Sequence, residues 1–148
     1  VVGSHSCSRG DSEDGVPPRM KLSTQFVARV RMLAGGPEVD LTWRLGPALA
    51  AHAATRANYH APLSPEGNGL DIEGAAVVGD RMYLGLRAPA TDHTTVLGVS
   101  SGALFTPAPE PRAAVALSAH RVALGDRVGI RDMAALPDGR LLVLSGPA

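Results

Sequence analysis

Asp71 and Glu73 are the residues of this sequence whose types and spacing best suit chemistry. They lie two positions apart at the start of an apolar run, residues 71–78, that predicts a β-strand, so both side chains should point to one face. Such a pair can hold a hard cation such as Ca²⁺, which takes about six to eight oxygen ligands. The alternative is that they pair with Arg87 and Arg131 and join neighbouring units, because charges near a core are usually paired. The few oxygens nearby do not complete a calcium shell, which favours the structural interpretation.

His5 and Cys7 form a second arrangement that could do chemistry, in the segment GSHSCS. An imidazole near a thiol suggests zinc binding or a cysteine nucleophile. A structural zinc site needs about four ligands at defined spacing, and the sequence offers no CxxC or HxxxH partner. We therefore expect these two residues in an exposed polar loop.

Two further motifs carry less weight. Residues 98–102 (GVSSG) match the GxSxG nucleophile elbow, which works only where a strand turns sharply into a helix. The prolines within residues 103–111 exclude a long helix there, so we interpret the match as a turn at a strand end. Residues 11–15 (DSEDG) resemble a calcium loop but lack the distal glutamate of the EF-hand pattern, which favours a solvated loop.

A repeat indicates which elements must position these residues. Residues 70–90 (LDIEGAAVVGDRMYLGLRAPA) align with residues 128–148 (VGIRDMAALPDGRLLVLSGPA) without a gap, at an offset of 58. The apolar positions agree, and Leu84, for example, falls on Leu142. Each copy contains two apolar runs joined by a turn. Self-similarity at a fixed spacing marks stacked units of one supersecondary type.

The rest of the sequence predicts more strands and one helix. Strands are expected at residues 94–99, 114–124, 25–32 and 38–44, and an Ala-rich helix at residues 47–56. In the last of these strands Val39, Leu41 and Trp43 alternate with polar residues, which is the pattern of a half-buried antiparallel strand. Pro47 suits the first turn of the helix, where its missing N–H costs nothing.

Repeated units of four antiparallel strands predict an all-β fold, and more specifically the blades of a β-propeller with one short helix in an inter-blade connection. A β-sandwich built from similar hairpins is the alternative. In the propeller, residues 1–45 end one blade, 46–69 form the helix and loop connection, 70–125 form one complete blade and 126–148 begin the next. A closed propeller takes roughly four to eight blades, so the chain is expected to be a fragment of a single propeller domain.

Composition excludes some partners. The chain has 148 residues with 14 basic and 14 acidic side chains, and this balance argues against a nucleic-acid surface. No apolar run approaches the roughly 20 residues of a membrane-spanning helix, so no membrane partner is expected. Aromatic residues make up only 3%, so aliphatic side chains must build the core. Nothing in the sequence indicates a compartment.

The segment LDIEGAAVVGDRMYLGLRAP, with VVGSHS at the start and GIRDMAALPDGRLLVLSGP at the end, resembles the bacterial domain of unknown function 3616 family. The core Leu-Asp-Ile-Glu-Gly followed by Gly-Leu-Arg is the most specific part of the resemblance. The resemblance implies a propeller-like all-β fold and no established activity. The Asp-x-Glu-Gly strand is also similar, more loosely, to first strands of phytase-like propellers.

In a propeller the first strand of each blade lines the central channel, so loops at one end of several blades share a rim. That rim would collect Asp71, Glu73, Arg87, Asp92, His93, His5, Cys7, Asp126, Arg127, Arg131 and Asp132. Such mouths are common ligand sites. The candidate ligand-binding residues are Asp71, Glu73, Arg87, Arg131, Asp132 and His5, and Asp71 and Glu73 are the candidate ligands of a divalent cation such as calcium.

Three functions remain open at this point. The leading hypothesis is a propeller domain that binds a small molecule, an anion or a metal at its channel mouth. The second is a metal-dependent phosphoester or ester hydrolase of the phytase-like type, in which Asp71 and Glu73 hold a cation that activates water while Arg87 and Arg131 clamp the anion. The third is a protein-interaction scaffold whose blades present only a docking surface.

Overall fold

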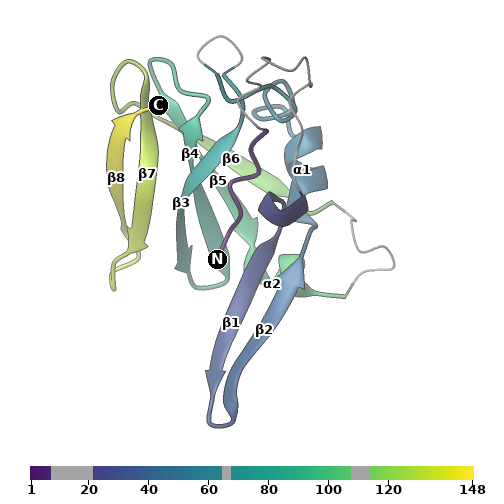
Figure 1. Ribbon diagram of the computed structural model, residues 1–148. Helices are drawn as coiled ribbons and strands as arrows, with labels where there is room; N and C mark the ends of the chain where they lie inside the picture. The colour runs from purple at the N-terminus through teal and green to yellow at the C-terminus, as the bar shows by residue number, and fades with distance from the viewer. Residues whose placement is uncertain (8–21, 65–67, 108–113) are drawn as a thin grey trace.

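The computed structural model describes residues 1–7, 22–64, 68–107 and 114–148. Within these residues the chain is mostly β, with antiparallel sheets and two short α-helices in an open multi-sheet arrangement (Figure 1). The predicted all-β class is confirmed. None of the described helices is long and apolar enough to cross a membrane. The acidic motif at residues 11–15 lies outside the described residues.

The strands predicted from apolar runs and alternation are present, with ends that differ by a few residues. The elements are a 3₁₀ turn (Leu22–Thr24), β1 (Val27–Leu33), β2 (Gly36–Thr42), α1 (Leu45–Ala51), β3 (Asp71–Val78), β4 (Arg81–Ala88), β5 (Thr94–Ser100), α2 (Ser101–Phe105), β6 (Leu117–Val122), β7 (Val128–Ala135) and β8 (Leu141–Pro147). The predicted helix is shorter than expected, because the chain becomes extended at His52. Thr55 Oγ1 then donates a hydrogen bond back to Leu49 O at 2.6 Å, which satisfies a carbonyl group in the last turn of the helix.

β3, β4, β5 and β6 form one four-stranded antiparallel sheet in which sequence neighbours are also spatial neighbours. The two-residue turn Gly79-Asp80 joins β3 to β4, since Val78 pairs with Arg81. Gly79 has a φ of 59°, which glycine adopts without a steric penalty. This strand order is a meander, in which the connection between β5 and β6 also contains α2.

The central sheet β3–β6 is covered on both faces. On one face its aliphatic side chains pack with α1 and with Val27 at the start of β1. The central-sheet members of this core are Ile72, Met82, Leu84, Leu86, Leu97 and Val99. On the other face, Ile130 and Met133 of β7 are buried with Ala76 and Val96. The two cores therefore hold the central sheet between α1 and β7 (Figure 1).

The contact between β7 and the central sheet is closest at a pair of glycines. Gly74 and Gly85 face each other across β3 and β4. A Cβ atom added at Gly74 would lie 2.8 Å from Ile130 Cγ2, and one added at Gly85 would overlap the same atom more severely. Met133 also crowds both positions. Because glycine lacks a Cβ, these two positions let β7 pack directly on the sheet.

The two aligned copies differ in the register of their second strands. Leu84 pairs with Ala75, and Val143 pairs with Met133, which is the residue aligned with Ala75. Leu142, which is the residue aligned with Leu84, pairs with Ala134 instead. Leu84 is fully buried, but Leu142 is 61% exposed. In the structure Val143 is therefore the counterpart of Leu84, and the gapless alignment is wrong by one residue along β8. The cause is a register shift between Ile130 and Asp132, since a shift of one residue turns each side chain to the opposite face.

β1 and β2 form a hairpin that projects from the rest of the molecule (Figure 1). One face carries ion pairs, with Arg29 Nη2 2.9 Å from Asp40 Oδ2 and Arg31 Nη2 3.0 Å from Glu38 Oε2. The opposite face carries Val30, Met32, Val39 and Leu41. The alternation predicted a half-buried strand with Val39, Leu41 and Trp43 on its buried face. That prediction is wrong, since these side chains are 55%, 50% and 37% exposed and no described element covers this face.

The glycine contact predicts a sharp sensitivity to one methyl group. Gly85→Ala should lower the free energy of unfolding by about 1–3 kcal/mol, because the added Cβ must displace Ile130 and Met133 from a packed interface. Gly35→Ala is the matched control, since a Cβ there meets nothing within 4 Å. Urea unfolding measures both variants. Equal stability of the two variants would contradict the close packing.

Candidate functional site

Glu73 and Arg131 both lie where the register of a strand pair shifts. On β3 the shift between Ile72 and Gly74 leaves Glu73 without a partner on β4. On β7 a similar shift leaves Arg131 without a partner on β8. Such bulges re-aim side chains and are over-represented beside functional sites. The two residues are 58 positions apart, which is the offset of the repeat.

Both residues belong to one ion-pair cluster, which comprises Asp71, Glu73, Arg87 and Arg131. Arg87 Nη1 donates to Glu73 Oε1 at 3.0 Å and lies 3.6 Å from Asp71 Oδ2. Arg131 Nη1 donates to Glu73 Oε2 at 3.2 Å, and its Nη2 donates to Pro147 O. Glu73 thus joins an arginine of β4 to an arginine of β7.

The cluster is partly shielded from water and balanced in charge. The exposed fraction of the side chain is 6% for Asp71, 20% for Arg87, 29% for Glu73 and 31% for Arg131. Two carboxylates face two guanidinium groups, so neither sign is left in excess. The ion pairs expected from the sequence are present. Partial burial strengthens such pairs, because less water and salt screens them.

The described residues contain no ready-made metal centre. No group of three or more His, Cys, Asp or Glu side chains among them is placed to hold an ion. The oxygens of Asp71 and Glu73 instead face the guanidinium groups of Arg87 and Arg131. A calcium ion would need about six oxygens, so it would have to displace these arginines. Calcium binding at this pair stays a prediction.

His5 and Cys7 are buried, so the expectation of an exposed polar loop is wrong. The physical reason is tertiary: His5 N donates to Thr24 O, which places this segment beside the residues that lead into β1. His5 Nδ1 lies 2.7 Å from Gly3 O, while Nε2 is buried and has no hydrogen-bond partner among the described residues. Burial lowers the pKa of His5, although the backbone groups of Gly3 and Gln25 partly oppose the shift.

Burial also affects the thiol of Cys7. It raises the pKa of Cys7, which disfavours the thiolate that a nucleophile or a zinc ligand requires. Cys7 forms an isolated parallel bridge with Pro62, so the segment is held by backbone pairing. His5 and Cys7 are therefore part of the protein interior.

Asp132 does not join the ion-pair cluster. Its carboxylate Oδ1 accepts a hydrogen bond from Met133 N at 2.8 Å. Its side chain is exposed and lies beside Leu142 and Leu144 on the outer face of the β7–β8 hairpin. The one-residue bulge at Arg131 explains this, since it turns Asp132 out of line with the cluster.

Asp92 and His93 form a separate exposed group with Arg121. His93 Nδ1 lies 2.5 Å from Asp92 Oδ1 and 2.7 Å from Arg121 Nη2. One ring nitrogen cannot donate to Asp92 and accept from Arg121 at once, so each tautomer of His93 allows only one of these two hydrogen bonds. The hydrogen bonds from His93 and Thr91 hold the pKa of Asp92 below its ordinary value.

Asp80 is a polar centre that the sequence did not single out. Its carboxylate accepts hydrogen bonds from Ser100 Oγ, Ser101 Oγ and Gly102 N at 2.6–2.8 Å. These hydrogen bonds, with that from Ser100 the largest cause, lower the pKa of Asp80. The position of Asp80 in a tight turn gave no signal, because its partners follow about 20 residues later.

The GVSSG segment does lead from a strand into a helix, since β5 ends at Ser100 and α2 starts at Ser101. The expected strand-end turn is therefore a short helix. Ser100 Oγ accepts from Ala103 N at 3.0 Å and donates to Asp80, so the hydroxyl caps the helix. No described histidine contacts it, which argues against a nucleophile.

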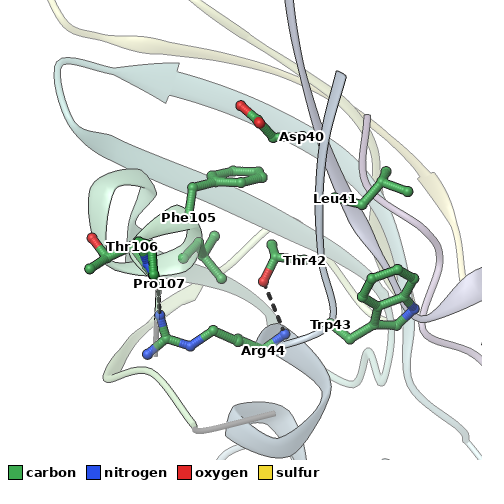
Figure 2. Close-up of a pocket in the computed structure, with 9 residues that line it drawn as sticks. Asp40, Leu41, Thr42, Trp43, Arg44, Phe105, Thr106 and Pro107 are labelled. Atoms are coloured by element: carbon green, nitrogen blue, oxygen red, sulfur yellow. Dashed lines mark hydrogen bonds between the residues drawn. The ribbon is translucent and has the colours of Figure 1, made fainter. Parts of the chain in front are cut away.

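A groove of about 350 Å³ lies between the end of β2 and α2 (Figure 2). Figure 2 shows Asp40, Thr42 and Arg44 on the side of Phe105, while Leu41 and Trp43 point the other way. Arg44 Nη1 donates to the carbonyl oxygens of Ala103 and Thr106, which ties β2 to the end of α2. Residues so distant in sequence gave no local signal for this groove.

Taken together, the fold and the cluster define a mostly β domain of stacked antiparallel sheets joined by an inter-sheet ion-pair network. Residues 49–148 match the family described as "Protein of unknown function (DUF3616)", and the chain belongs to this family. No curated protein and no solved structure matches the chain. The family membership confirms the resemblance found in the sequence.

The buried imidazole predicts how stability depends on pH. The unfolded chain carries His5 with a pKa near 6.5, and burial lowers the folded value. As the pH falls through about 6.5, the unfolded state therefore binds more protons than the folded state, and the free energy of unfolding decreases. His5→Asn should weaken this loss between pH 7.5 and 5.5, because asparagine tolerates the φ of 53° but does not titrate there.

Urea unfolding at several pH values measures this effect. His60→Asn serves as the control, since His60 is exposed. The idea fails if the wild-type chain and His5→Asn lose stability in parallel on acidification.

A double-mutant cycle tests the ion pair between the sheets. Glu73→Gln and Arg131→Gln, singly and together, should reveal a coupling of about 1 kcal/mol in low salt that shrinks as salt is added. Asp138 and Arg140 form the control pair, whose side chains are 52% and 77% exposed, and should couple more weakly. Urea unfolding provides the energies, and additive effects of the first pair would exclude a stabilising bridge.

Proposed function

We propose that this chain is part of a β-propeller whose ion-pair cluster lies at the channel mouth and binds a small anionic ligand. The supporting observation is the convergence of Arg87 and Arg131, from different sheets, on the single carboxylate of Glu73. A ligand carboxylate or phosphate carries the same oxygens as Glu73. It can therefore compete with Glu73 for the same two guanidinium groups.

Three observations support the propeller arrangement. The central sheet is a four-stranded meander, as expected for a blade. β7 stacks face to face on this sheet through the contact with Gly74 and Gly85. The bulges at Glu73 and Arg131 recur at the repeat offset. In this proposal residues 70–125 are one blade, flanked by the ends of two others in residues 1–45 and 126–148, with 46–69 as the connection.

The chemistry of the cluster favours an anion over a cation as its ligand. A guanidinium carries five N–H donors in a planar fork, which is more than the contacts of Arg87 and Arg131 with Glu73 and Pro147 use. Arginine pairs recognise carboxylate and phosphate groups through such forks. A cation would first have to separate Asp71 and Glu73 from their arginines. Anion binding therefore requires less rearrangement.

Calorimetric titration of the full chain tests this proposal. The probes are inorganic phosphate, succinate and calcium chloride, each added separately. Arg87→Gln with Arg131→Gln should weaken phosphate or succinate binding at least about tenfold, which corresponds to the loss of one charge-assisted contact. Arg140→Gln is the control, since Arg140 lies in the exposed turn before β8 and should leave binding unchanged.

The same titration separates the competing functions. Calcium binding that disappears in Asp71→Asn with Glu73→Gln would favour the cation site and, with turnover of phosphoesters or esters, the hydrolase. Anion binding that survives the double arginine substitution would remove the proposed ligand site. Absence of binding by all three probes would leave the cluster with a purely structural role.

A further inference from the structure

The side chain of Glu73 is held by its two ion pairs. Its Oε1 accepts from Arg87 Nη1 at 3.0 Å, and its Oε2 accepts from Arg131 Nη1 at 3.2 Å. It makes no other side-chain hydrogen bond among the described residues. The register shift on β3 leaves Glu73 without a partner on β4, and 29% of its side chain is exposed. The carboxylate can therefore turn out to solvent by rotation about side-chain bonds, without movement of the strand.

The guanidinium group of Arg131 has a second attachment that does not involve Glu73. Its Nη2 donates to Pro147 O at the end of β8. A Cβ atom added at Gly146 would lie 3.4 Å from both Cγ and Nε of Arg131, so the arginine side chain passes over a residue without a side chain. Arg131 should therefore keep its position when Glu73 turns away.

Arg87 is also fixed independently of Glu73. Its Nη1 lies 3.6 Å from Asp71 Oδ2, and the Asp71 side chain is 6% exposed. Its backbone packs against β7, since a Cβ atom added at Gly129 would overlap Arg87 O. The two guanidinium groups therefore form a preorganised pair, and preorganisation lowers the free-energy cost of binding a ligand.

Asp71 limits the charge that a ligand at this pair can carry. Asp71 Oδ2 and Glu73 Oε1 lie 3.6 and 3.0 Å from the same atom, Arg87 Nη1, so a ligand oxygen in place of Oε1 approaches the Asp71 carboxylate. With Glu73 turned out, two guanidinium groups face one carboxylate and leave one positive charge. A single carboxylate cancels that charge. A phosphate group carries about −1.5 to −2 at neutral pH, so it exceeds that charge and is repelled by Asp71.

We propose that Glu73 is an internal ligand, which occupies the anion site until the carboxylate of a small molecule displaces it. This role rests on the proposed function and specifies its ligand, which presents a single carboxylate. The incoming group places one oxygen on Arg87 of β4 and the other on Arg131 of β7, as Glu73 does. A tethered competitor acts at an effective concentration of millimolar or more, so it should weaken the affinity of the wild-type chain about tenfold.

Glu73→Ala tests this proposal, because acetate carries the same heavy atoms that the substitution removes. Calorimetric titration of the full chain with sodium acetate measures the affinity, and sodium chloride at equal concentration controls for ionic strength. Acetate should bind Glu73→Ala at least about tenfold more tightly than it binds the wild-type chain. It should also bind this variant at least about tenfold more tightly than inorganic phosphate does. Addition of Arg131→Gln should abolish the gain.

A matched control and a second variant accompany this titration. Asp138→Ala removes a carboxylate from the exposed pair with Arg140, so this variant should bind acetate as the wild-type chain does. Glu73→Gln keeps the size of the side chain but removes its charge, and acetate should again bind more tightly than to the wild-type chain. Circular dichroism checks the fold of each variant. In urea unfolding, acetate should raise the midpoint of Glu73→Ala more than that of the wild-type chain, because it binds the folded state.

The outcomes separate this inference from the proposed function. Equal acetate affinity in the wild-type chain and both Glu73 variants, or no acetate binding by either variant, would overturn the inference. Phosphate that binds Glu73→Ala as tightly as acetate would do the same. The proposed function survives these results if the wild-type chain binds an anion through Arg87 and Arg131. Acetate binding by Glu73→Ala, with no anion bound by the wild-type chain, would overturn both, because Glu73 would then be a permanent structural partner.

Discussion

The close approach of β7 to the central sheet is the contact on which the rest of the structure depends. It is possible because Gly74 and Gly85 face each other across β3 and β4, where any Cβ would collide with Ile130 and Met133. Gly129 repeats the device at the start of β7, since a Cβ there would overlap Arg87 O. Three small residues thus set the distance between two sheets. Aliphatic side chains then fill most of the interface, and the partly buried Tyr83 packs against them.

The ion-pair cluster follows from that distance. Arg131 reaches Glu73 only because β7 lies directly on β3, and both side chains are turned toward each other by bulges. The same geometry leaves Asp132 outside the cluster. A network that joins two sheets through one carboxylate stabilises their relative position. It also collects guanidinium groups where an acidic ligand can compete for them.

The hairpin β1–β2 differs from β7, because it exposes its apolar side chains instead of packing them on another sheet. Its charges pair with one another on the side toward α2, and its apolar side chains face outward. Apolar side chains that face water are costly, because their burial is favourable. The family is described only as a protein of unknown function, so a role has to be sought in the geometry of the ion-pair cluster.

The sequence by itself determined the strands and the predominance of β-structure, because alternation, turn residues and repeated apolar runs are local signals. It favoured pairing of Glu73 with Arg87 and Arg131 over cation binding only through the general rule that charges near a core are paired. Tertiary structure decided the rest. Burial of His5, the outward turn of Leu142 and the exposed face of β1–β2 depend on which segments pack together and on a bulge of one residue. A period-two pattern states that one face of a strand is apolar. It does not state what covers that face.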